Sequence, residues 1–147
     1  MHTLRFLTFI GIFLGLFSLN TVAAPAFDEE GMHKVVIQVS DDNARTQTIA
    51  MNNAVNLQKH YGMDNVRVEI VAYGPGLSML VGGGKQSQRV ESLAMQDIVF
   101  SACANTMSRI EKKEGKPVVL SKGVQVVQAG VARIVELQDK GYRYIRP

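Results

Sequence analysis

The sequence contains a single cysteine, Cys103, and this scarcity limits what can hold the fold together. One cysteine cannot form an intramolecular disulfide, so the stability of the domain must come from its apolar core. The thiol is left as a buried apolar group, as a free reactive group or as half of a mixed disulfide.

Several common catalytic and metal-binding patterns are also absent. The chain has no Cys/His cluster with zinc spacing and no Gly-x-Ser-x-Gly nucleophile elbow. The run Gly82-Gly83-Gly84-Lys85 fails as a phosphate loop, because Met79 and Gln86 stand where such a loop needs glycine and a hydroxyl residue. These glycines predict a flexible lid or a connector. For the protein as a whole we expect neither a metal nor an organic cofactor.

The sequence has little excess charge, with 16 Lys+Arg against 13 Asp+Glu and a formal net charge of +3. The basic residues are scattered, and Lys112-Lys113 is the only adjacent pair. No aromatic residues alternate with them in a way that would stack bases. We therefore expect no nucleic-acid partner.

Residues 1–26 have the pattern of a secretory signal peptide. His2 and Arg5 precede an apolar run at 6–19, and small residues follow. Cleavage after Ala26 fits the small-x-small rule, and the bond two residues earlier is the alternative. An uncleaved anchor is disfavoured because a spanning helix needs ~20 apolar residues. We expect a periplasmic or secreted protein that has no membrane association after removal of the signal.

The remaining residues, 27–147, have the usual length of one domain. Strand and helix patterns alternate along this segment, and a loop is expected from 74 to 84. The expected strands lie at 34–39, 66–73, 97–102, 124–127 and 142–146, and the expected helices end near 61, 95, 114 and 139. Alternation of this kind predicts βαβ units. We therefore expect a three-layer α/β/α fold with a mainly parallel, five-stranded sheet.

Capping residues mark the starts of two of these helices. The segment Ser40-Asp41-Asp42-Asn43 supplies side chains that can cap the first helix. Asn105, Thr106 and Ser108 are alternative caps of the third helix, and Ser108 with Glu111 has the spacing of a capping box.

The loops that follow the first three strands meet at one edge of a parallel sheet, where such folds bind ligands. Cys103 is the candidate reactive residue, because the positive end of a helix dipole beside a strand end favours a thiolate. The candidate pocket residues are Asp41, Asp42, Tyr73, Gly74, Gly76 and Asn105.

Structural interpretations compete with these functional ones. Cys103 can be a small core residue, and Asp41 and Asp42 can be helix caps. His33 and His60 are the histidines that could serve as a base for the thiol. However, His33 lies before the first strand, at the amino edge of the sheet, and His60 closes a helix, so both are expected to be surface residues.

Several segments resemble the DsrE/DsrF-like family in the right order, over nearly all of 27–147. These are Lys34 to Asp42, Met51 to Leu57, Ala72 to Leu77, Phe100 to Met107 and Gly141 to Pro147. The resemblance implies the α/β/α fold and assembly into homo- or hetero-oligomers such as trimers and hexamers. It is closest to an exported branch of the family.

In the sulfur-relay members of that family, a cysteine after the third strand carries a persulfide and passes sulfane sulfur to a partner. Cys103 matches that position, so the resemblance implies a persulfide carrier whose partner is a sulfur donor or acceptor protein or a small thiol. The relay members act in the cytoplasm, whereas this chain carries a predicted export signal. The alternatives are a non-catalytic oligomeric binding or assembly module, and a thiol-redox partner that forms an intermolecular disulfide.

Overall fold

The computed structural model describes residues 31–147, and the predicted signal peptide lies outside the described residues. The elements follow one another as β1 (His33–Val39), α1 (Ala44–Tyr61), η1 (Met63–Asn65), β2 (Val66–Ala72), η2 (Gly74–Leu80), α2 (Ser87–Ala94), β3 (Ile98–Cys103), α3 (Ala104–Glu114), β4 (Val124–Val127), α4 (Gly130–Asp139) and β5 (Arg143–Ile145). Among these residues, none of the helices combines the length and apolar character that a membrane crossing requires.

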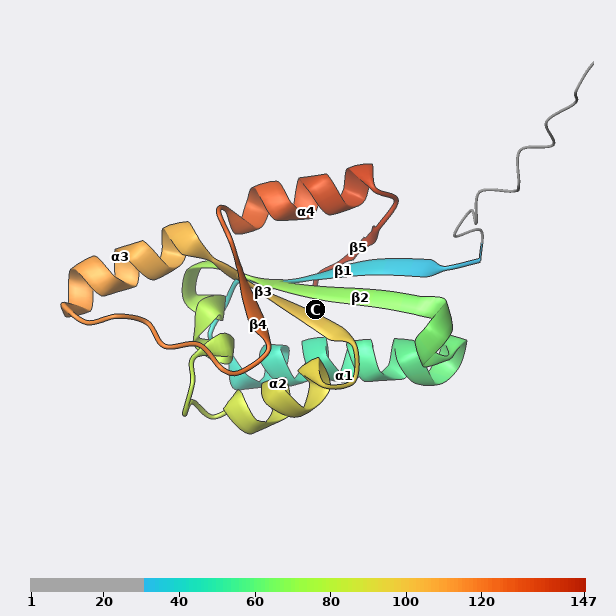
Figure 1. The fold of residues 1–147 in the computed structure, drawn as a ribbon, viewed down its shortest axis with the longest axis horizontal. Coiled ribbons are helices and arrows are strands. Elements are labelled where there is room, and N and C mark those ends of the chain that lie inside the picture. The colour runs from blue at the N-terminus through green and yellow to red at the C-terminus, as the bar shows by residue number, and fades with distance from the viewer. Residues whose placement is uncertain (1–30) are drawn as a thin grey trace, which may run out of the picture.

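All five strands pair in parallel, in the order β4-β3-β2-β1-β5. The three longest strands lie in the middle of the sheet and the two shortest lie at its edges, as expected for buried runs of β-branched residues. Helices cover both faces, and α1 and α2 lie on the side opposite α4 (Figure 1). The predicted three-layer α/β/α fold is confirmed.

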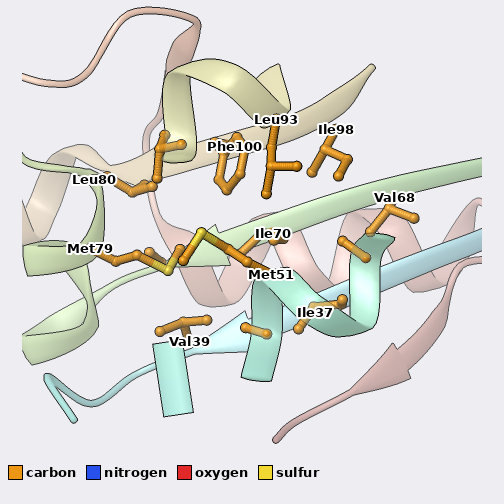
Figure 2. Packing of buried hydrophobic residues seen from close by; sticks show 14 of the residues in the cluster. Ile37, Val39, Met51, Val68, Ile70, Met79, Leu80, Leu93, Ile98 and Phe100 are labelled. Carbon is orange, nitrogen blue, oxygen red and sulfur yellow. The ribbon is translucent and has the colours of Figure 1, made fainter. Parts of the chain in front are cut away.

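The main core lies between the sheet and the layer formed by α1, α2 and η2. Alternate residues of β1, β2 and β3 point into it, since successive side chains of a strand face opposite ways. Phe100, Ile70 and Met51 are each 0% exposed in this cluster (Figure 2). This layer supplies most of the apolar burial that stabilises the described domain.

The opposite face of the sheet is covered by α4 and has a different character. Its apolar cluster has only four buried members, which are Val36, Val71, Ile134 and Leu137. Beside them, Arg133 of α4 donates two hydrogen bonds of 2.8 Å to the carboxylate of Glu69. The Ser101 hydroxyl donates to the same carboxylate and accepts from Gln125. A charged pair and two polar side chains thus join α4 to three strands.

The helix η2 occupies part of the stretch that was predicted to be a loop. Pro75 fits the first turn of a helix because its missing N–H would have no partner there. Leu77, Met79 and Leu80 bury their side chains fully in the main core. Burial of these three residues outweighs the breaking tendency of the Gly-Pro-Gly run, and the loop prediction was wrong from residue 74 to 80.

The third helix starts earlier than its polar residues suggested. Helix α3 begins at Ala104, directly after β3, so Asn105, Thr106 and Ser108 lie inside it. Glu111 accepts the backbone N–H of Val118 at 3.0 Å and does not form the predicted capping box. The N-cap position of α3 is Cys103 itself, whose side chain caps no backbone group.

Candidate functional site

Cys103 is the last residue of β3 and lies at the carboxyl edge of the sheet, where α3 projects away from the strands (Figure 1). Its register with Val127 places it on the α4 side, two residues after Ser101. The side chain is 5% exposed, yet it belongs to neither apolar cluster. The thiol is therefore covered at the edge of the sheet, outside the hydrocarbon core.

Two helix starts converge on the sulfur of Cys103. The backbone N–H groups of Asn105 and Thr106, in the first turn of α3, lower the pKa of its thiol, and that of Asn105 also donates to the Gln128 carbonyl at 3.3 Å. The N–H of Gly130, the first residue of α4, is a third donor from a segment distant in sequence. Such N–H groups have no partner within their own helix and carry the positive end of its dipole, so both helices favour an anion at this position.

The Thr106 hydroxyl is the fourth donor to the sulfur. Its oxygen accepts the backbone N–H of Gly74 at 3.0 Å, so its own proton is free to be donated to Cys103. Thr106 is 9% exposed, which keeps this arrangement away from competing water. The loop after β2 thereby sets the direction of a hydrogen bond to the residue that ends β3.

These contacts decide the pKa of the thiol. Burial raises the pKa of Cys103. The Thr106 hydroxyl and the N–H groups of Gly130, Thr106 and Asn105 together lower this pKa by more than burial raises it. The net result is a pKa below the ordinary cysteine value, because a thin cover at the sheet edge desolvates the sulfur less than four donors stabilise it.

A polar wall lies on the β5 side of the sulfur. Burial raises the pKa of Tyr73 most, and Tyr144 and Cys103 also raise it, whereas Arg146 lowers it. Tyr144, Arg146 and Cys103 are thus electrostatic neighbours of the Tyr73 phenol. The hydroxyl of Tyr144 donates to Gln38 at 2.7 Å. Tyr73 is therefore a neutral hydrogen-bonding group at neutral pH, and Arg146 adds an exposed positive charge.

Glycines allow the loops to approach the site. A side chain at Gly130 would collide with the ring of Tyr73, and one at Gly76 would collide with the Val39 carbonyl. Gly74 has a φ of 56°, in the left-handed region that glycine adopts without strain. Of the predicted pocket residues, Tyr73 and Asn105 lie near Cys103, Gly74 donates to Thr106, and Gly76 donates its N–H to the Tyr73 carbonyl at 3.1 Å.

Of the two aspartates of the predicted pocket, Asp41 has a structural contact, whereas the Asp42 carboxylate has no hydrogen-bond partner among the described residues. The Asp41 carboxylate accepts the N–H of Asn43, and Asn43 caps α1 through the N–H groups of Arg45 and Thr46. Asp42 is exposed. Within residues 31–147 no contact joins either carboxylate to Cys103, so their role in a pocket stays a prediction.

The histidines lie away from the thiol, as expected. His33 begins β1 at the amino edge of the sheet and stacks on Tyr61 with ring centroids 3.7 Å apart. His60 is exposed near the end of α1. In the described part of the chain, no group of three or more His, Cys, Asp or Glu side chains could hold a metal ion.

Sequence reasoning missed Thr106 and Gly130 at the thiol and Arg146 near Tyr73. Thr106 was interpreted as a helix cap, although its position three residues after Cys103 points its side chain back toward the helix start. Gly130 is far from Cys103 in sequence and reaches it through the fold of α4, and Arg146 reaches the neighbourhood of Tyr73 because it follows β5. The glycine before Val131 was the one local signal, since it permits close approach to an aromatic ring.

Comparison with known proteins relates the chain to two solved structures. No family model matches the chain, and no curated protein matches it. The solved structure of MTH1491, a protein of unknown function from Methanobacterium thermoautotrophicum, is similar with a TM-score of 0.68 and 34% identity, over 78% of this chain and 99% of that one. The ychN protein from E. coli, which has a DsrE-like fold, is similar with a TM-score of 0.62 and 14% identity, over 79% of this chain and 100% of that one.

The two comparisons support different statements. The second is too distant to show more than the fold, which is DsrE/DsrF-like. The first extends over nearly the whole archaeal protein at 34% identity. The chain therefore belongs to the same family as MTH1491.

Proposed function

We propose that this protein is an exported member of the DsrE/DsrF-like family that carries sulfane sulfur on Cys103. The observation that carries the proposal is the convergence of the starts of α3 and α4 on one sulfur atom, with four hydrogen-bond donors around it. Donors in this number favour an anionic sulfur, and both a thiolate and a persulfide are anions of that kind. The DsrE-like fold and the position of the cysteine after β3 support the same function.

The chemical step is an exchange between two sulfur anions. The Cys103 thiolate attacks the outer sulfur of a donor persulfide R–S–S⁻, a new S–S bond forms to Cys103, and the S–S bond of the donor breaks. The products are the Cys103 persulfide and the thiolate R–S⁻, so charge and electrons balance without an added oxidant. In the delivery step, an acceptor thiolate attacks the outer sulfur of the Cys103 persulfide, takes up that sulfur and releases the Cys103 thiolate.

The direct test is mass spectrometry of the intact protein after treatment with a persulfide donor. Wild type should gain the mass of one sulfur atom, and the gain should disappear after reduction. The Cys103→Ser variant should gain nothing. If wild type and variant give the same spectrum, Cys103 is not the carrier.

A second candidate function is favoured by the burial of Cys103, which is only 5% exposed. On this view the protein is a non-catalytic assembly module and the cysteine is a packing residue. It predicts that the folded thiol resists small alkylating reagents and that Cys103→Ala leaves oligomer formation unchanged. Rapid alkylation of the folded protein would contradict it.

We also propose that the protein forms a homo-oligomer through the α4 side of the sheet. Val131 and Val135 of α4 are 62% and 53% exposed, and Val99 on the same side of the sheet is 40% exposed. Exposed apolar residues on one side favour an interface. Sedimentation of wild type and of a Val131→Lys, Val135→Lys variant tests this, and a monomeric wild type would contradict it.

Export is the last part of the proposal and rests on the pattern of residues 1–26. The full-length chain, expressed in a bacterium, should appear in the periplasm as a shorter form that begins at Phe27. Retention of the complete chain in the cytoplasm would contradict export. This test is independent of the chemistry at Cys103.

A further inference from the structure

A groove of about 650 Å³ lies beside Cys103, between η2, α3 and the segment after α3. Its volume is within the range of ordinary ligand sites, ~300–1,000 Å³. Apolar side chains supply much of its lining, among them Pro75, Val81, Ile110, Val118 and Val119. Val119 is 69% exposed, so the groove presents apolar surface that a ligand could cover.

One face of α3 forms a wall of this groove and runs away from the thiol. Thr106, Ile110 and Lys113 line it at the spacing i, i+4, i+7, and Arg109 lines it beside them. Seven residues of helix rise about 10 Å, so the cationic end of this wall lies roughly 10 Å along the axis from Thr106. The groove therefore has an inner end at Thr106 and an outer, charged end.

The charge at the outer end is positive. Arg109, Lys113 and Lys116 line the groove together with one carboxylate, that of Glu114, which gives a net charge of +2. Glu114 is paired with Lys116 at 3.5 Å. Arg109 and Lys113 have no ion-pair partner within residues 31–147. Two exposed cations next to apolar surface complement a ligand that has an apolar body and an anionic end.

The inner end of the groove is connected to the reactive sulfur. Thr106 lines the groove, and its hydroxyl is also a donor to Cys103. Gly74, which donates its N–H to the Thr106 oxygen, lines the groove as well. Thr106 therefore belongs both to the lining of the groove and to the surroundings of the thiol.

We propose that this groove binds the organic part of the sulfur donor, which would be a persulfide of an elongated apolar thiol with an anionic group about 10 Å from the sulfur. This inference rests on the proposed function and specifies its substrate class. The outer sulfur lies at Thr106, the apolar chain covers Ile110, Val118 and Val119, and the anion lies at Arg109 and Lys113. After transfer to Cys103, the thiolate R–S⁻ leaves through the same groove.

Binding is tested with the Cys103→Ser variant of the mature chain and three unreactive thiols, by calorimetry. Mercaptooctanoate has the apolar chain and the anion, mercaptooctanol has only the chain, and mercaptoacetate has only the anion. Mercaptooctanoate should bind most tightly. Adding Arg109→Gln or Lys113→Gln should weaken its binding about two- to fivefold each, as for an exposed ion pair, and should leave mercaptooctanol unchanged.

Two further substitutions complete the binding test. Lys112 is exposed on the same helix and does not line the groove, so Lys112→Gln is the matched control and should change nothing. Val119→Ser should weaken both long-chain thiols and leave mercaptoacetate unaffected. Equal binding of all three thiols, or equal effects of Lys112→Gln and Lys113→Gln, would overturn the assignment of the groove.

Sulfur transfer is measured separately on wild type with the persulfides of the same three thiols. Preferential transfer from the mercaptooctanoate persulfide, lost in Lys113→Gln, supports both proposals. If mercaptooctanoate binds in the groove as described but Cys103 gains no sulfur, the carrier function is wrong and the groove assignment stands. If all three persulfides load Cys103 at equal rates, the carrier function stands and the groove assignment is wrong.

Discussion

The two faces of the sheet are built differently, although they share the same three central strands. The face toward α1, α2 and η2 is packed with apolar side chains such as Ile70 and Phe100. The face toward α4 has four buried apolar residues, the Glu69–Arg133 ion pair and Cys103. Apolar packing on one face stabilises the fold, and this leaves the other face free to hold charged and polar groups that serve a site.

The largest effect is expected from a cavity in the apolar face. Phe100 is 0% exposed, and Phe100→Ala should lower the free energy of unfolding by about 3–5 kcal/mol. Val99 precedes it on the same strand, points to the other face and is 40% exposed. Val99→Ala should cost within about 0.5 kcal/mol. Equal losses in chemical denaturation would show that the two faces do not differ in packing.

The next effect concerns the ion pair on the α4 face. Breaking a fully buried pair costs about 3–5 kcal/mol, and the 24% exposure of Arg133 reduces this, so Glu69→Gln should cost about 1–3 kcal/mol. Glu136 pairs with the same arginine but is 59% exposed. Glu136→Gln should therefore cost within about 0.5 kcal/mol. If both substitutions cost the same, the network on this face does not hold α4.

A smaller effect on stability, with a specific effect on reactivity, is expected at Thr106. Thr106→Val removes the hydroxyl donor to Cys103, so the pKa of the thiol should rise and its alkylation at neutral pH should slow. Loss of the bond to Gly74 should cost about 1 kcal/mol. Thr48→Val, which removes a hydroxyl donated to Ala44 on α1, is the control. An unchanged alkylation rate in Thr106→Val would contradict the role of this hydroxyl.

The smallest effect is the dependence of stability on pH through Cys103. The thiol pKa is lowered in the folded state, so the folded state binds fewer protons between the folded and unfolded pKa values. The resulting stabilisation is complete above the unfolded pKa and is lost as pH falls through the folded pKa. The difference in unfolding free energy between wild type and Cys103→Ala should therefore grow with rising pH. A difference that shrinks with rising pH would mean that burial dominates at the sulfur.

The fold could be predicted from sequence because its signals are local. Runs such as Val35-Val36-Ile37 indicate a strand that is buried on both faces. The alternation of such strands with helices then predicts a parallel sheet. The η2 helix was missed because its stability comes from burying Leu77 and Leu80 and not from the composition of its first turn. Burial of this kind depends on partners far away in the chain.

The site was predictable only in part for the same reason. Cys103 and Tyr73 were identified because both follow strands that end at one edge. Gly130 lies 27 residues after Cys103 and reaches it only through the packing of α4, which Glu69 and Arg133 secure. The charge of Glu69 between Val68 and Ile70 was a signal that a buried partner exists, but the sequence does not say which cation supplies it.

The central claim is that four N–H and O–H groups at the meeting point of α3 and α4 lower the pKa of the Cys103 thiol. The most direct measurement is the rate of alkylation of this single thiol across a range of pH, in the folded protein and in denaturant. The account predicts a folded-state midpoint below the denatured-state midpoint. A folded-state midpoint equal to or above that of the denatured chain would contradict it.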